Sequence, residues 1–392
     1  MLSRTFHILT ESEPFSEQSG GAISRWVANA VRADDASIVL APSADATWRW
    51  NPSRIRVVTG LTGYKQFCSQ GGHRLPWMIK LKIIARLLDR ELADLKAGDT
   101  VWVHNRPEFA LALQPFIAAR GARLVLHLHN SHLVDWPPRI IRALKVDRYV
   151  FVSHYLQNEA LNKYPDLQGT CVMHNGADGI LFHEAPPERP DNAVPVVLFA
   201  GRLVPDKGVH IFMDAMDTLA ARKVPIEGRV VGGAGFGDSA PTDYVRKIQS
   251  RPSENVRLLP YCSGEELAEE FRSADIFCLP SIWQEPLGMA PIEAMASGVP
   301  VVVSRSGGMP ELLQFGGGIA VERGSSDALA DALQHLAINP ALRRQLGKEA
   351  LTSFRDNFTW DAVYRRYLSI LNFDSSPADS LDLIPQELCN EH

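Results

Sequence analysis

Paired cysteines, long apolar segments and an excess of positive charge are all absent from this sequence. The five cysteines show no Cys-x-x-Cys spacing, which disfavours a zinc site or a disulfide framework and indicates reduced thiols in the cytoplasm. No apolar segment approaches the length of a membrane-spanning helix, and the N-terminal sequence lacks the apolar core of a signal peptide. The net charge of -5 argues against nucleic acid as a partner, because proteins that bind it carry a basic surface.

The composition is that of an ordinary globular protein, and the chain is too long for one domain. Hydrophobic residues make up 45% and charged residues 22% of the sequence. A chain of 392 residues exceeds the size at which a single hydrophobic core keeps growing. Short apolar runs alternate with longer helical patterns, which is typical of parallel sheets built from strand–helix–strand units. We therefore predict an α/β protein with two doubly wound domains.

A Pro-rich polar stretch at 184–194 interrupts this alternation and predicts a linker between domains at 1–183 and 195–357. Open α/β sheets bind ligands beyond the carboxyl ends of their strands, so functional motifs should follow strands. The predicted strands are 6–9, 37–40, 56–58, 100–103, 123–128 and 148–152 before the linker, and 196–199, 228–231, 256–259, 276–279 and 299–303 after it.

The most informative motif spans 281–300, where two carboxylates bracket a turn that opens a helix. A carboxylate accepts two hydroxyl groups at once, so Glu285 and Glu293 suit a sugar ring or a ribose diol. Peptide N–H groups at a helix start are unpaired and carry the positive end of the helix dipole, so the backbone that follows Leu287 can hold a phosphate. The alternative for Glu293 is that it serves only the helix dipole.

A second motif, Phe199 to Gly208, follows a predicted strand and precedes a helix. Arg202 can place its guanidinium on two phosphate oxygens, and Lys207 can add a point charge. Fixed positive charge lowers the barrier when negative charge accumulates on a departing diphosphate. Taken alone, the same residues would also suit a solvated surface loop.

Together these motifs resemble the donor site of the retaining glycosyltransferases of family four, which have the GT-B fold of two Rossmann-like domains facing a cleft. The resemblance rests on Glu285-x7-Glu293, on the Ala-Met-Ala-Ser-Gly-Val-Pro that follows, and on the Gly-Arg…Lys-Gly loop. It implies that Arg202 and Lys207 stabilise the leaving diphosphate. It also implies that Glu285 orients the hydroxyls of the donor sugar, that Glu293 holds the ribose diol, and that no enzyme nucleophile is used.

Further matches lie in both halves of the chain. Gly20 and Gly21 resemble the family's Gly-Gly loop near the diphosphate and the acceptor, although a structural turn explains a glycine pair equally well. His129 matches the family's histidine near the donor sugar, and the choice over His127, on the same strand face, rests on the family pattern alone. Tyr261 falls in the loop that contacts the nucleotide base in relatives, with core packing as the alternative.

Departures from the family pattern leave the identity of the sugar donor open. Leu287 stands where Phe is commoner, Pro260 where Gly is usual and His174 where Pro is usual. None of these removes a charged group from the predicted site. The predicted set is catalytic Arg202, Lys207, Glu285 and His129, and donor-binding Glu293, Gly20, Gly21, Leu287, Gly288, Met289, Ala290 and Tyr261.

The resemblance implies a hexosyltransferase that acts without metal or cofactor, in agreement with the absence of an Asp-x-Asp motif. Its donor would be a nucleotide diphosphate sugar, with a UDP-sugar favoured and GDP-mannose open. Its acceptor would be a glycan or lipid-linked hydroxyl in bacterial polysaccharide or lipopolysaccharide synthesis. Two alternatives stay open: a GT-B sugar-nucleotide 2-epimerase, whose acid/base carboxylates we cannot place, and a non-catalytic sugar-nucleotide-binding protein, which needs no cations for a leaving group.

The helix predicted at 76–95 joins Trp77 to several basic residues, which suits peripheral contact with the cytoplasmic face of the inner membrane. The alternative, which acidic residues later in the segment favour, is an ordinary packed helix. Relatives return their last helix, here 358–373, to the first domain. The acidic stretch at 374–392 is predicted to be a mobile tail.

Overall fold

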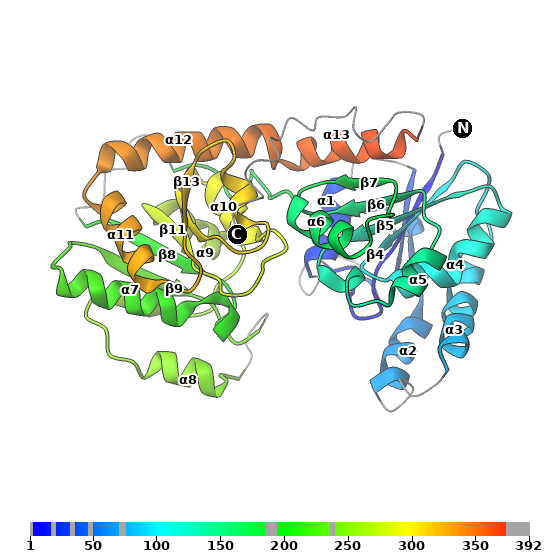
Figure 1. Cartoon of the computed structure of the whole chain (residues 1–392), viewed down its shortest axis with the longest axis horizontal. Helices are drawn as coiled ribbons and strands as arrows, with labels where there is room; N and C mark the ends of the chain where they lie inside the picture. Colours follow the sequence, from blue (N-terminus) through cyan, green and yellow to red (C-terminus); the bar gives the residue numbers. More distant parts are fainter. Residues whose placement is uncertain are drawn as a thin grey trace. The chain divides into compact units, whose positions relative to one another are not determined.

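The computed structural model describes residues 3–16, 21–31, 36–45, 50–69, 76–185, 194–235 and 240–373. They form two compact units, each built on its own sheet (Figure 1). The first comprises the described parts of Met1–His174 and Val363–His392, and the second comprises those of Asn175–Ala362.

The first sheet has seven described strands, all parallel, in the order β3-β2-β1-β4-β5-β6-β7. The order reverses between β1 and β4, and because crossovers are right-handed, this reversal places helices on both faces. The strands are β1 (Thr5–Ile8), β2 (Ser37–Ala41), β3 (Ile55–Val57), β4 (Thr100–His104), β5 (Arg123–Leu128), β6 (Arg148–Phe151) and β7 (Thr170–Val172). The α-helices are α1 (Ala22–Ala30), α2 (Thr59–Ser69), α3 (Trp77–Asp89), α4 (Pro107–Ala119), α5 (Pro138–Ala143), α6 (His154–Lys163) and α13 (Trp360–Leu371).

The second sheet has six described strands, again all parallel, in the order β10-β9-β8-β11-β12-β13, and its order reverses between β8 and β11. The strands are β8 (Val196–Ala200), β9 (Glu227–Val231), β10 (Val256–Leu259), β11 (Ile276–Leu279), β12 (Val301–Ser304) and β13 (Gly318–Val321). The α-helices are α7 (Val209–Ala221), α8 (Asp243–Gln249), α9 (Glu265–Ser273), α10 (Met289–Ala296), α11 (Ser326–Ala337) and α12 (Pro340–Asn357).

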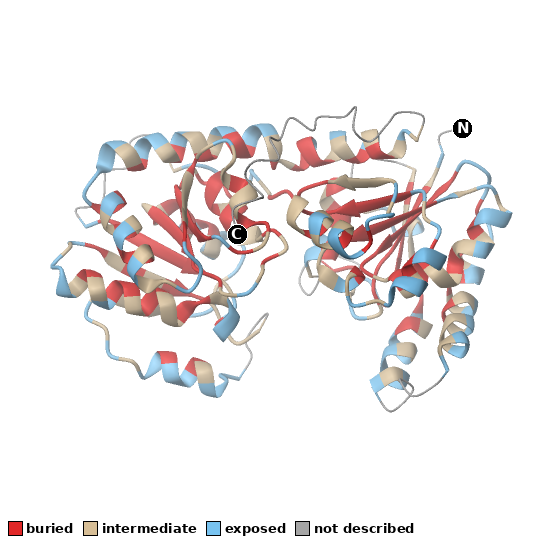
Figure 2. Ribbon diagram, in the orientation of Figure 1, coloured by how far each residue is buried: buried red, intermediate tan, exposed pale blue. Residues whose placement is uncertain are grey.

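Burial explains why the central strands read as continuous apolar runs. Every residue of β1, β4, β6, β8, β11 and β12 is buried, since helices cover both faces of each sheet (Figure 2). The doubly wound α/β architecture predicted from the sequence is therefore confirmed in both units.

The division between the compact units falls directly after His174, nine residues before the predicted end of the first domain at residue 183. The Ala177 amide donates to Phe358 O at 3.0 Å, and the ring of Phe182 packs edge-on against Phe271 with centroids 5.5 Å apart. The Pro-rich stretch marks a change in composition, whereas the change in packing partners comes earlier. Residues 186–193 of the predicted linker lie outside the described residues.

The last described helix, α13, packs on the first sheet. Tyr367 is completely buried, and its hydroxyl lies 3.2 Å from His7 Nε2 in β1. A second contact brings Arg366 NH1 to 3.4 Å from His174 Nδ1. The second unit extends to Ala362, beyond the predicted 357, and the predicted tail at 374–392 lies outside the described residues.

Helix α3 is shorter than the predicted 76–95 and has two different faces. Ile84 and Leu88 are completely buried on the side that packs against α4. Met78 and Ile79 are 64% and 43% exposed. None of the described helices combines the length and the apolar character needed to cross a bilayer.

We predict that Phe271→Ala destabilises the second unit by about 3–5 kcal/mol, because it leaves a cavity among packed aromatic rings. Phe271 is completely buried and contacts both Phe182 and Phe277. The matched control is Phe315→Ala, whose side chain is 50% exposed and whose loss should change stability by less than about 0.5 kcal/mol. Urea unfolding followed by circular dichroism measures both, and equal effects would contradict the packing described here.

Candidate active site

A lysine and a glutamate form a close ion pair at the carboxyl edge of the second sheet. Lys207 Nζ lies 2.5 Å from Glu285 Oε1, and the two side chains are 16% and 3% exposed. Ser281 Oγ donates to the same oxygen at 2.8 Å. A carboxylate buried this deeply requires both a counter-charge and hydrogen bonds, and these two partners supply them.

The two loops that carry this pair are held together by one backbone carbonyl. Lys207 ends the 3₁₀ turn Pro205–Lys207 after β8, while Ser281 follows the neighbouring strand β11. The Asp206 carbonyl accepts from Ile282 N at 2.9 Å and from Trp283 N at 3.2 Å, and Ser281 Oγ lies 2.8 Å from the same carbonyl oxygen. The site therefore forms where the strand order reverses, as expected for an open α/β sheet.

Two glycines allow the backbones at this edge to approach each other. Gly208 has φ 73°, and a Cβ there would lie 1.9 Å from Pro280 O. Gly307 has φ 59°, and a Cβ there would lie 2.0 Å from Glu285 O. The Gly308 amide then donates to the same Glu285 carbonyl at 2.8 Å. Any side chain at 208 or 307 would push the ion pair out of place.

Helix α10 begins beside the pair and leaves its first amides without a side-chain cap. Gly288 is the N-cap residue with φ 93°, and among the described residues no side chain caps the N–H groups that follow it at Met289 and Ala290. Leu287 is only 1% exposed, so its side chain packs in the core. The arrangement can therefore offer backbone amides to an anion.

The two glutamates of the motif differ in their surroundings. Glu285 is 2% exposed and ion-paired, whereas Glu293 is half-buried within α10. The backbone carbonyl of Glu293 accepts from both the amide and the hydroxyl of Ser297, at 3.2 Å and 3.1 Å. Glu293 lies beyond the first turn of α10, which weakens the reading that it serves only the helix dipole.

Arg202 and Tyr261 are exposed near the same edge. Arg202 follows β8, and its guanidinium makes no ion pair or hydrogen bond within the part of the chain that the structure describes. Tyr261 follows β10 with 40% of its side chain exposed, which excludes core packing. Both side chains are therefore available to a ligand.

In the first unit, a carboxylate already occupies the start of α1, where Gly21 is the N-cap residue. Glu13 Oε1 accepts from the Ser24 amide at 2.9 Å, and a Cβ on Gly21 would lie 2.6 Å from that oxygen. Burial raises the pKa of Glu13. Gly20 lies outside the described residues. The predicted approach of Gly21 to a diphosphate therefore requires Glu13 to move or to share these amides.

The structure separates His129 from His127. His129 is half-buried just beyond β5, and its amide donates to Asn105 Oδ1 at 2.7 Å. His127 is completely buried inside the same strand. Burial lowers the pKa of His129 to about 3, so its ring is neutral. Only His129 lies at the edge where a ligand could reach it.

Several residues of these edges were missed by the sequence analysis. Ser281 contacts the predicted Glu285 directly, but a serine four residues away carries no signal by itself. Arg106 binds Glu11 through two hydrogen bonds of 2.7 Å and 2.6 Å, which join the loops after β4 and β1. The sequence shows only that Ser281, Arg106 and Glu11 each follow a predicted strand closely, which is not enough to predict these contacts.

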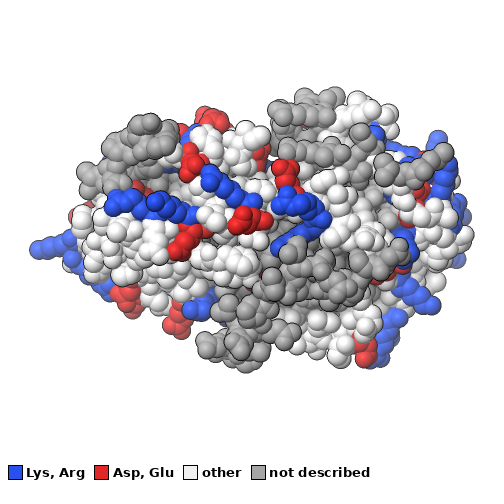
Figure 3. All heavy atoms as spheres, turned by 90° about the horizontal axis from the view of Figure 1, so that it is seen from above, with Lys and Arg blue, Asp and Glu red and all other residues white. Residues whose placement is uncertain are grey.

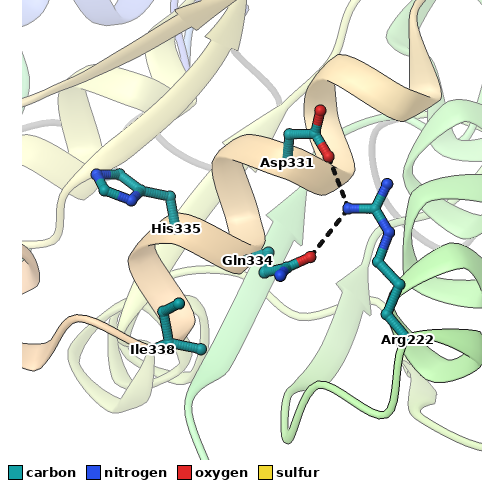
Figure 4. Close-up of a pocket in the computed structure, with 5 residues that line it drawn as sticks. All are labelled: Arg222, Asp331, Gln334, His335 and Ile338. Atoms are coloured by element: carbon teal, nitrogen blue, oxygen red, sulfur yellow. Dashed lines mark hydrogen bonds and ion pairs between the residues drawn. The ribbon is translucent and has the colours of Figure 1, made fainter.

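A surface pocket elsewhere on the second unit contains none of the predicted residues (Figure 4). It lies at the carboxyl ends of α7 and α11, which return to the amino edge of the sheet. There Arg222 NH1 contacts Asp331 at 2.6 Å and Gln334 at 2.9 Å. Figure 3 shows positive and negative side chains mixed over α12, so this helix presents no uniformly basic surface.

Comparison with known proteins shows which family part of this chain resembles. Residues 184–352 match the family model described as glycosyl transferases group 1. Spore coat protein SA of Bacillus subtilis is 26% identical over 302 residues, which cover 71% of this chain and 80% of that protein. The GDP-mannose-dependent monoacylated alpha-(1-6)-phosphatidylinositol monomannoside mannosyltransferase of Corynebacterium glutamicum is 26% identical over 295 residues, covering 70% of this chain and 76% of that protein.

The fold has close counterparts among solved structures. Anabaena Alr3699/HepE, solved in complex with UDP, superposes with a TM-score of 0.71 at 19% identity, covering 94% of this chain and 99% of that one. The match over residues 184–352 and these relatives make the chain similar to the group 1 glycosyl transferases, and its two doubly wound units have the GT-B fold.

Proposed function

We propose that this glycosyltransferase moves a hexose from a nucleotide diphosphate sugar to an acceptor hydroxyl with retention of anomeric configuration. The observation that carries the proposal is the buried ion pair between Lys207 and Glu285 beside the uncapped start of α10. A protein that only bound the sugar nucleotide would need shape and hydrogen bonds. A buried, oriented ammonium group suits a site where negative charge grows during the reaction.

The proposed roles follow from charge and position. The Lys207 ammonium group has two further N–H groups besides the one directed at Glu285, and these can donate to phosphate oxygens. Arg202 and the first amides of α10 add positive charge to the same leaving diphosphate. Glu285 holds Lys207 in place and accepts from sugar hydroxyls, and Glu293 holds the ribose diol. These groups supply enough positive charge that the proposal requires no metal at the donor site.

The bond changes balance without an enzyme nucleophile. The bond between the sugar carbon and the phosphate oxygen breaks, and the acceptor oxygen bonds to that carbon on the same face. The departing phosphate oxygen takes the acceptor's proton. The surrounding cations act chiefly in the transition state, when the charge on the diphosphate is greatest, so they raise turnover more than affinity.

The relatives support two sugar donors. The HepE structure contains UDP, and the mannosyltransferase of Corynebacterium glutamicum is named for GDP-mannose. We favour a UDP-sugar and keep GDP-mannose as the second candidate, with a glycan or lipid-linked acceptor in bacterial surface polysaccharide synthesis. The exposed Met78 and Ile79 of α3, next to Lys80 and Lys82, support peripheral contact with an anionic membrane surface at the site of synthesis.

We predict that Lys207→Ala lowers turnover by about 10²- to 10³-fold, the usual cost of removing one group that stabilises transition-state charge. Nucleoside diphosphate release under saturating donor measures the effect. Lys348→Ala, which removes an exposed lysine from α12, is the matched control and should leave turnover unchanged. Circular dichroism checks that the variant folds, because Glu285 loses its counter-charge. Unchanged turnover in folded Lys207→Ala protein would contradict the proposed role of Lys207 in stabilising the leaving diphosphate.

Glu285→Gln should lower turnover by about 10- to 100-fold, since hydrogen bonds to a charged group contribute about 1.5–3 kcal/mol. The amide preserves the shape of the side chain and can still accept from Ser281, but it no longer holds Lys207 by charge. Glu322→Gln, at an exposed position, is the control. If Glu285→Gln changed only the Michaelis constant for the donor, Glu285 would be a binding group without a part in the transition state.

A panel of uridine, guanosine and adenosine diphosphate sugars, with and without lipid-linked or oligosaccharide acceptors, tests the whole proposal. We expect nucleoside diphosphate release from one donor, stimulated by acceptor and lost in Lys207→Ala. An isomerised sugar nucleotide formed without acceptor would instead favour the epimerase. Tight binding with no release from any donor would favour a non-catalytic protein.

A further inference from the structure

Three histidines gather near the carboxyl ends of β4 and β5 in the first sheet. His104 ends β4 and pairs in register with His127 of the neighbouring strand β5. His129 follows two residues later, on the same strand face as His127. One ring nitrogen from each residue lies within 4.8 Å of the others.

The spacing already approaches that of a metal site. His104 Nδ1 and His129 Nε2 lie 3.1 Å apart, and the ring centroids of His127 and His129 are 4.0 Å apart. Zinc–nitrogen bonds of about 2.0–2.1 Å at tetrahedral angles place ligand nitrogens roughly 3.3–3.4 Å apart. One nitrogen of His127 lies within 4.8 Å of a ring nitrogen of each of the other two histidines, so small side-chain movements would complete the set.

The hydrogen bonding of these rings is incomplete. Both ring nitrogens of His127 and the Nδ1 of His129 are buried and have no hydrogen-bond partner within the described residues. A buried polar group left unpaired costs about 1–3 kcal/mol.

A hydrogen-bonded chain lies behind His104. Its Nε2 lies 3.3 Å from His7 Nδ1, and His7 Nε2 lies 3.2 Å from the Tyr367 hydroxyl on α13. If His104 binds an ion through Nδ1, its Nε2–H can donate to His7, and His7 can donate in turn to Tyr367. Metal-binding histidines are usually fixed in this way through their second nitrogen.

From this geometry we propose that His104, His127 and His129 bind one divalent transition-metal ion of the zinc class. Three imidazoles suit zinc, cobalt, nickel or copper rather than magnesium or calcium, which prefer oxygen ligands. The half-buried His129 provides the entrance, while Trp26 and Trp102 pack against His127 from inside. Three protein ligands leave a fourth position for water. The inference does not depend on the proposed transfer reaction.

The test uses the full chain with any affinity tag removed, stripped by a chelator and titrated with Co²⁺ and then Zn²⁺. We expect one equivalent of Co²⁺ per chain with the visible absorption of a four-coordinate site, and displacement by Zn²⁺. His127→Leu should abolish the absorption, while His335→Gln, an exposed histidine on α11, should leave it unchanged. His7→Phe should weaken binding about 10- to 100-fold by removing the partner of His104.

Circular dichroism checks the folding of each variant, and His129→Asn at the edge of the sheet replaces His127→Leu if that protein does not fold. Absence of the cobalt absorption from folded wild-type protein would overturn the proposal, and would indicate that water alone satisfies these rings. Cobalt binding that survives the loss of His127 and of His129 would overturn it as well, because the ion would then lie elsewhere.

Discussion

The buried charge of Glu285 is the constraint on which the carboxyl edge of the second sheet depends. A carboxylate that is 2% exposed is stable only with a counter-charge and hydrogen bonds in place. Lys207, which follows the neighbouring strand β8, supplies the counter-charge. The carbonyl of Asp206 lies between the two loops and binds both. The same demand explains why glycines, rather than residues with side chains, occupy the positions where the backbones come closest.

The two sheets use the same topology to build edges of opposite character. In the second unit, the reversal of strand order holds a charged pair and the start of α10, which is an environment for an anion. In the first unit, the ends of β4 and β5 hold imidazoles packed against indole rings, an environment that offers nitrogen lone pairs. The sequence families of such folds can therefore vary chemistry at each edge while keeping the sheets unchanged.

The parts that were predictable are those in which local sequence determines structure. Glu285 and Lys207 each belong to a short motif after an apolar run, so their positions followed from the fold class. The contact between His7 and His104 joins residues that are 97 positions apart, so neither the periodicity nor the spacing of the sequence predicts it. The Glu13 carboxylate at the start of α1 was missed for the same reason, because its placement depends on how a whole loop folds back. The division between the units at His174 carries no signal in composition, because composition and packing change at different points of the chain.

The first unit is assembled from two stretches of sequence, and the whole second unit is inserted between them. A fragment that stops at His174 would lack Tyr367, and the space that this buried ring fills beside Trp102 and His7 would be empty. Removing α13 would therefore disrupt the packed core beside β1 and β4, at the centre of the first sheet. Each unit packs around its own sheet, yet the first can be complete only after the ribosome has finished the second.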